Sequence, residues 1–180
     1  IEGRGITNVI PCLRSGDIVE TVAESETDAD LIIVGKRGEA ADFAKLHVGS
    51  NLERIARSST KPVFVTARAF KPIKRFMIAY DGGTSAMKAV DHVARSPLFS
   101  GLECSLLMVG AESEENLKRL SNAQATLEAG SFTVNANIAP GQAETVISNA
   151  VKEQGIDLLV MGAYGHSRIR SLIIGSTTSE

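Results

Sequence analysis

The sequence predicts an α/β protein in which strands alternate with helices and pair into parallel sheets. Short apolar runs of four to six residues recur along the chain, and the segments between them carry apolar residues at helical spacing. Such alternation forms βαβ units, which assemble into an open, Rossmann-like parallel sheet. The whole pattern also occurs twice, once in each half of the chain. We therefore expect two α/β modules in tandem.

The first half is expected to hold three strands and two helices. A strand is predicted at residues 7–11, and a helix follows Gly16 and Asp17, because an aspartate in the first turn suits the helix dipole. A strand buried on both faces follows at residues 31–34. A second helix starts near residues 49–51, and a third strand covers residues 63–66.

The second half begins after a polar stretch, residues 68–74, whose Pro72 suits a linker. Expected strands are residues 75–80, 104–109, 132–139 and 158–161, and expected helices are residues 85–95, 114–129 and a segment after Pro140 and Gly141. Leu117, Leu120, Ala123 and Leu127 are expected to face inward from the 114–129 helix, and its charged residues to form a solvated face.

Composition and charge narrow the possible functions. A net charge of −2 gives no support for a nucleic acid or an anionic membrane as partner. No apolar run approaches the roughly 20 residues that a membrane span needs. Cys12 and Cys104 lack the spacing of a metal site. We expect two reduced thiols, no bound metal cluster and a cytoplasmic location.

A glycine-spaced stretch after the last apolar run carries the strongest functional signal. Gly162 and Gly165 are separated by two residues, and nine residues later come Gly175 and Ser176, followed by Thr177 and Thr178. Glycines at a strand end let the backbone approach a ligand closely. Backbone N–H groups and hydroxyls at a helix start are well suited to phosphate. The stretch predicts a phosphate site.

The two halves resemble each other in register. The segment from Ser15 to Gly38 and the segment from Pro140 to Gly165 share a glycine turn, a helix, an acidic residue, an apolar strand and G-x-x-G. Both then reach Gly-Ser, at Gly49 and at Gly175. We expect residues 1–69 to be the C-terminal part of a first module. Residues 70–180 are expected to be a second module that lacks its last helix and strand.

This combination resembles the universal stress protein family in its tandem form. The match is carried by G-x-x-G-x9-G-[ST], by A-Y-D-G-G-T-S-A around Asp81, and by the order P-G-Q-A-E-T-V-I…I-D-L-L-V-M-G that leads into the signature. The resemblance implies an adenine nucleotide alpha hydrolase-like fold and a stress-response protein that binds ATP, with Mg²⁺ as a possible companion. It also implies pairing of the modules or a homodimer.

The resemblance assigns roles to nine residues. Asp81 would lie near the ribose and Val109 would contact adenine through its backbone. Met161, Gly162 and Gly165 would line the ribose and triphosphate path, and Gly175, Ser176, Thr177 and Thr178 would bind phosphates. These positions follow parallel strands, where open α/β sheets bind ligands. No catalytic residue is assigned.

The first module departs from the signature. Ten residues, not nine, separate Gly38 from Gly49, and Lys36 and Arg37 stand where the second module has Ala163 and Tyr164. A degenerate site is one interpretation. The other is that Lys36, Arg37 and Lys45 neutralise a phosphate. His166, Arg168 and Arg170 are either phosphate neighbours or solvated loop residues.

Two alternatives to simple ATP binding stay open. One is slow ATP hydrolysis or self-phosphorylation at Ser176 or Thr177, although the sequence shows no positioned general base. The other is a scaffold whose modules merely pair and need no nucleotide.

Overall fold

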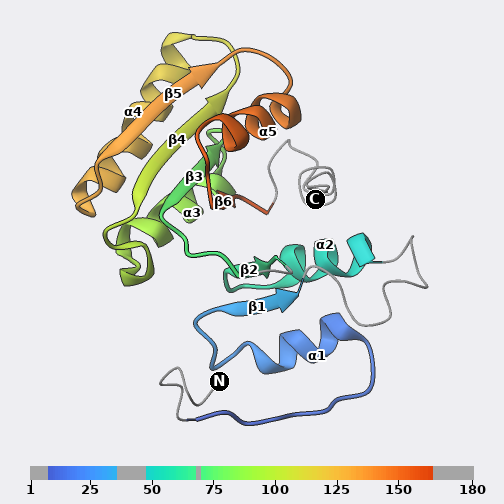
Figure 1. Ribbon diagram of the computed structural model, residues 1–180. Helices are drawn as coiled ribbons and strands as arrows, with labels where there is room; N and C mark the ends of the chain where they lie inside the picture. The colour runs from blue at the N-terminus through green and yellow to red at the C-terminus, as the bar shows by residue number, and fades with distance from the viewer. Residues whose placement is uncertain (1–7, 36–47, 68–69, 164–180) are drawn as a thin grey trace. The chain divides into compact units, whose positions relative to one another are not determined.

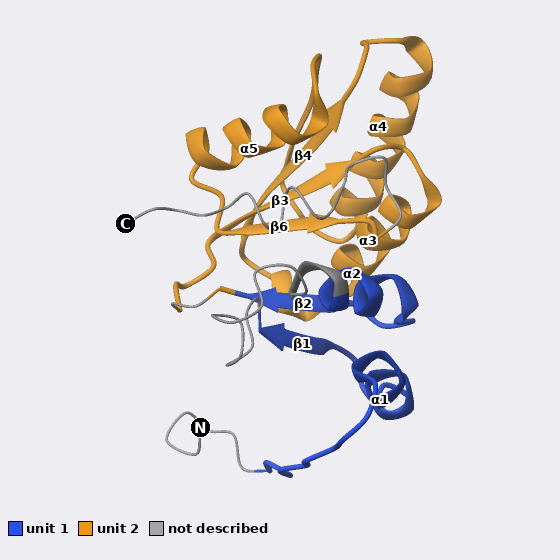
Figure 2. Ribbon diagram, turned by 90° about the vertical axis from the view of Figure 1, so that its right-hand side faces the viewer, with its two compact units in different colours: residues 1–66 blue, residues 67–180 orange. Residues whose placement is uncertain are grey.

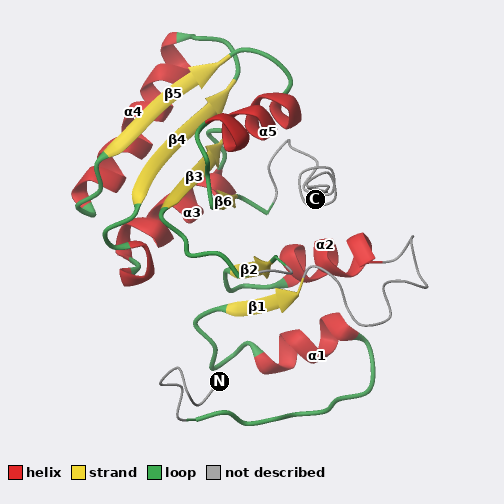
Figure 3. Ribbon diagram, in the orientation of Figure 1, coloured by secondary structure: helices red, strands yellow, loops and turns green. Residues whose placement is uncertain are grey.

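The computed structural model describes residues 8–35, 48–67 and 70–163 and divides into two compact units, residues 1–66 and 67–180 (Figure 2). We refer to them as unit 1 and unit 2. Both units combine helices with parallel strands (Figure 3), so the predicted α/β class is confirmed.

Unit 2 contains a four-stranded, wholly parallel sheet in the order β5-β4-β3-β6 (Figure 1). Its elements are β3 (Arg75–Tyr80), α3 (Thr84–Arg95), a 3₁₀ turn at Pro97–Phe99, β4 (Glu103–Val109), α4 (Glu114–Ala129), β5 (Val134–Ala139), α5 (Ala143–Glu153) and β6 (Leu158–Met161). Every strand and helix expected in residues 75–161 is present, with bounds that differ by two residues or fewer.

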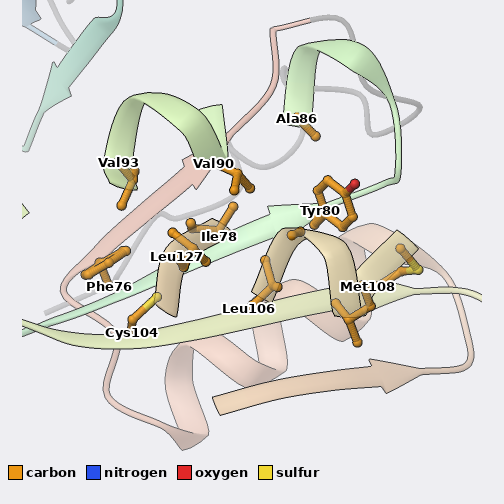
Figure 4. Close-up of a cluster of buried hydrophobic side chains, with 12 residues drawn as sticks. Phe76, Ile78, Tyr80, Ala86, Val90, Val93, Cys104, Leu106, Met108 and Leu127 are labelled. Atoms are coloured by element: carbon orange, nitrogen blue, oxygen red, sulfur yellow. The ribbon is translucent and has the colours of Figure 1, made fainter. Parts of the chain in front are cut away.

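Both faces of this sheet are covered, because side chains alternate along a strand. Phe76, Ile78 and Tyr80 of β3 pack into a cluster with residues of α3 and α4 (Figure 4). Met77 and Ala79 point the other way and pack with α5. Such double coverage is what a parallel sheet requires.

The packing of α4 differs from the prediction at one residue. Leu120, Ala123 and Leu127 are buried as expected, but Leu117 is 45% exposed. Leu117 lies in the first turn of α4, and only the later turns contribute to the cluster against the sheet. The expectation for Leu117 was wrong.

Asp157 fixes the start of the sheet. One of its carboxylate oxygens, Oδ2, accepts hydrogen bonds from the backbone N–H groups of Lys74 and Arg75, at 2.9 and 3.0 Å. These bonds to the charged form lower the pKa of the Asp157 carboxyl. They join the residue before β6 to the first residue of β3, which sets the two neighbouring strands in register from Phe76 and Leu158 onward.

The described part of unit 1, residues 8–35 and 48–66, contains two helices and a two-stranded parallel sheet. Its elements are α1 (Ile18–Ser25), β1 (Ile32–Gly35), α2 (Val48–Ser58) and β2 (Val63–Thr66). Asp17, which was expected in the first turn, is the N-cap residue of α1, and its Oδ1 accepts from the N–H groups of Val19 and Glu20.

Two predictions for unit 1 were wrong. Residues 8–11 form no strand, and Val9 and Ile10 are 53% and 81% exposed. The strand β1 is not buried on both faces, because Ile33 is 65% exposed. A strand forms only with a hydrogen-bonded neighbour. In the repeat, residues 8–11 correspond to β5 of unit 2, which pairs with β4. The strands in the described part of unit 1 are β1 and β2, which pair with each other, so residues 8–11 have no described strand to pair with.

Glu26 holds the helices of unit 1 together. It is 8% exposed, and its carboxylate accepts from Ser59 Oγ at 2.6 Å, from Thr60 N at 3.1 Å and from Thr60 Oγ1 at 2.8 Å. Ser59 and Thr60 form the turn between α2 and β2, so Glu26 ties that turn to the end of α1. The hydrogen bond from Ser59, followed by those from Thr60, lowers the pKa of this carboxyl.

Candidate functional site

The candidate site lies where the strand order of unit 2 reverses. The chain proceeds outward from β3 to β4 and β5, and α5 then returns it to β6 on the other side of β3. In open α/β sheets, ligands bind at the carboxyl ends of the strands at such a switch point. Asp81 follows β3 and Gly162 follows β6, and the register pairs Ala79 with Met161. The structure therefore brings together two of the predicted regions.

Asp81 shapes the turn that leads into α3. Its Oδ1 accepts from the backbone N–H of Gly83 at 2.8 Å, and Gly83 is the N-cap residue of α3. Gly82 adopts a φ of +77°, a left-handed conformation that favours glycine. Asp81 is half-buried at this edge. Its carboxylate thus lies at the helix N-terminus, where negative charge is stabilised.

Gly162 is a point of close backbone contact. A Cβ on this buried residue would lie 2.7 Å from the backbone nitrogen of Ala86 and 2.9 Å from the carbonyl carbon of Ser85. These atoms belong to the first turn of α3, so the end of β6 packs directly on the start of that helix. Glycine is therefore needed at this position by packing alone, a reason that the spacing pattern did not supply.

Val109 ends β4, the strand on the opposite side of β3 from β6. It is half-buried and packs at the α5 face, and the next residue, Gly110, donates to the carbonyl of Ala139 at 3.0 Å. Val109 and Asp81 thus end adjacent strands at one edge of the sheet. The structure therefore places both residues at the carboxyl edge of the sheet.

Arg119 is a residue of this edge that the sequence did not single out. Its i,i+4 ion pair with Glu115, 2.6 Å long, agrees with the expected charged helix face. However, a Cβ on Gly82 would lie 2.9 Å from Arg119 Cδ, so the arginine also covers the turn beside Asp81. Burial raises the pKa of the neighbouring Tyr80, and the positive charge of Arg119 opposes that shift. Helical spacing predicted the ion pair but not the contact of Arg119 with the turn at Gly82.

The remaining predicted residues lie outside the described part of the chain. They are Gly165, Gly175, Ser176, Thr177 and Thr178 of unit 2, together with Lys36, Arg37 and Lys45 of unit 1 and the loop residues His166, Arg168 and Arg170. Among the residues that are described, no three His, Cys, Asp or Glu side chains form a group that could hold a metal ion. No helix in these same ranges is long and apolar enough to cross a membrane.

The family model described as "Universal stress protein family" matches residues 7–67 and 72–180. The chain belongs to the universal stress protein family. A relative in Synechocystis, the universal stress protein Slr1230, is 38% identical over 182 residues. That alignment covers 100% of this chain and 63% of the relative, so the chain spans less than two thirds of the length of this universal stress protein.

A solved universal stress protein from Archaeoglobus fulgidus shares the fold: it aligns with a TM-score of 0.70 and 22% identity, over 97% of this chain and 65% of that one. An Arabidopsis thaliana member solved with AMP bound aligns over 59% of this chain and 88% of its own, with 20% identity and a TM-score of 0.49.

Proposed function

We propose that this universal stress protein is a stress-response regulator that binds ATP in unit 2, at the carboxyl ends of β3, β4 and β6. The observation that carries the proposal is that Asp81 and Gly162, the first signature glycine, follow adjacent strands at the switch point. The same edge of an open parallel sheet is where nucleotides are held in proteins of this class. In this proposal residues 70–180 are the binding module, and residues 1–69 are the C-terminal part of a first module whose site is degenerate.

The hydrogen-bonding groups at this edge of the sheet are suited to a nucleotide. Asp81 engages Gly83 through Oδ1, which leaves Oδ2 able to accept from a ribose hydroxyl. Val109 and Met161, at the ends of β4 and β6, would border the adenine and the ribose. Beyond Gly162, the backbone and hydroxyls of Gly165 and residues 175–178 would bind the phosphates.

A magnesium ion would reach this site with the phosphates. Mg²⁺ is commonly bound through substrate phosphates and one or two carboxylates. Asp81 is the carboxylate of the described residues that directly follows β3 at this edge. We propose no step of hydrolysis, because no observation on the described residues supplies a general base. Pairing of the modules or of two chains, and a cytoplasmic location, belong to the same proposal.

Titration calorimetry of the chain with ATP, with and without Mg²⁺, tests the proposal. Binding at one site per chain is expected. Gly175→Val should abolish it by crowding the phosphate backbone contacts, whereas the matched change Gly49→Val in unit 1 should leave it unchanged. An intact fold that binds no ATP would refute the proposal. Equal losses in both variants would refute the assignment to unit 2, and phosphate release above that of Gly175→Val would show hydrolysis.

A further inference from the structure

Arg119 lies directly on the turn that follows β3. A Cβ on Gly82 would fall 2.9 Å from Arg119 Cδ and 3.1 Å from its Nη1 atom. Both the aliphatic stem and the guanidinium therefore cover the backbone next to Asp81. The side chain belongs to α4, so it spans from the helix after β4 to the turn after β3.

Among the described residues, the guanidinium is held at one end by an ion pair. Nη2 donates to Glu115 Oε1 at 2.6 Å, and the Arg119 side chain is 47% exposed. A guanidinium has five N–H donors. Within the described part of the chain, Glu115 is the hydrogen-bond partner of the group. Because about half of the side chain is exposed, the guanidinium is accessible to a molecule at this edge.

The position of Arg119 favours one end of a nucleotide over the other. It lies next to Asp81 at the carboxyl end of β3, and its helix α4 follows β4, the strand that Val109 ends. The signature glycines instead follow β6, across β3 from β4. A nucleotide with its phosphates at the glycines would therefore place its base and ribose near Arg119.

We propose that Arg119 binds the base of the nucleotide by stacking its guanidinium on the purine ring. This inference rests on the proposed function. A guanidinium is planar and weakly hydrated, and it stacks on aromatic faces more readily than a lysine ammonium does. Glu115 pre-orients the group, which reduces the entropy lost when the base binds.

Calorimetry with adenosine, AMP and ATP distinguishes a contact of Arg119 with the base from a contact with the phosphates. Arg119→Ala should weaken binding of all three ligands by one common factor, roughly 5- to 30-fold, because a desolvated cation–π contact has that strength. Arg119→Lys keeps an aliphatic stem over Gly82 and so preserves the turn, but it loses the planar group and should also weaken adenosine binding. Lys118→Ala, an exposed neighbour on α4, should change nothing.

The possible outcomes are distinct. Unchanged adenosine affinity in both Arg119 variants would overturn the inference, and so would a loss that grows with the number of phosphates. If the unmodified chain bound none of the three ligands, the proposed function would fail and the inference with it. Thermal unfolding of each variant checks that the affinity loss occurs in a folded protein.

Discussion

Units 1 and 2 carry similar sequence patterns but form sheets of different completeness. In unit 2 the strand β3 has a hydrogen-bonded neighbour on each side and a buried cluster on each face. In the described part of unit 1 the strand β1 pairs with β2, and Ile33 is 65% exposed. Matching strand patterns therefore give matching burial only where neighbouring strands and covering helices are present.

The two units are also stabilised in different ways. Among the described residues, unit 1 buries Leu52 and Ile55, together with a carboxylate, Glu26, that is satisfied by three hydrogen bonds. Unit 2 depends on apolar packing on both faces of a sheet. Substitutions in each unit should expose this difference.

The largest difference is expected between an isoleucine on the doubly covered strand β3 and one on β1. Ile78→Ala in β3 removes a side chain that is 0% exposed and should cost about 2–5 kcal/mol. Ile33→Ala in β1 should change stability by less than about 0.5 kcal/mol. Hydrogen exchange of the backbone amides, followed by mass spectrometry, reports on each unit separately. Similar costs at both positions would contradict the contrast.

The next effect concerns two glycines that follow strands of unit 2. Gly162→Ala places a methyl group 2.7 Å from the Ala86 backbone nitrogen and should cost about 1–3 kcal/mol through overpacking. In Gly110→Ala the nearest atom is Asn116 Nδ2, at 3.5 Å, an ordinary contact. Denaturant unfolding of the two variants compares them. A destabilisation by Gly110→Ala as large as that by Gly162→Ala would argue against the close contact of β6 with α3.

The elements of unit 2 were predictable because each one carries its own periodic signal. The strand at residues 75–80 and the helix at residues 114–129 were predicted with the bounds that the structure shows. Contacts between elements were not predictable in this way. The exposure of Ile33 depends on which strands lie beside β1, and the need for glycine at position 162 depends on where α3 begins. Both features arise from contacts between elements that are distant in the sequence, so the pattern within one element does not predict them.

A pH-dependent effect is expected at Glu26. Its pKa is lowered in the folded state, so its contribution to stability is present above the ordinary value of 4.5 and is lost as pH falls through the lowered folded pKa. Glu26→Gln should therefore lower the melting temperature at pH 7, and the gap to the unmodified protein should narrow as pH falls from 4.5. Glu24→Gln, whose side chain is 70% exposed, is the control. A gap that stays constant with pH would exclude this role.

The smallest effect involves the thiols and leaves stability unchanged. Cys12 of unit 1 is exposed, whereas Cys104 of unit 2 is buried and burial raises the pKa of its thiol to about 12. The thiolate is the reactive form, so a thiol reagent at pH 8 should modify Cys12 quickly and Cys104 only after unfolding. If the reagent modified both thiols of the native protein at equal rates, the core of unit 2 would have to open readily.

The central claim is that unit 2 holds the nucleotide and unit 1 does not. Hydrogen exchange measured with and without ATP and Mg²⁺ tests it within a single chain. We predict slower exchange in peptides that cover residues 80–86 and 158–163, with no change in peptides from α1 and β1. Protection of the peptides around β1 would contradict the claim, and so would unchanged exchange throughout unit 2 at saturating ATP.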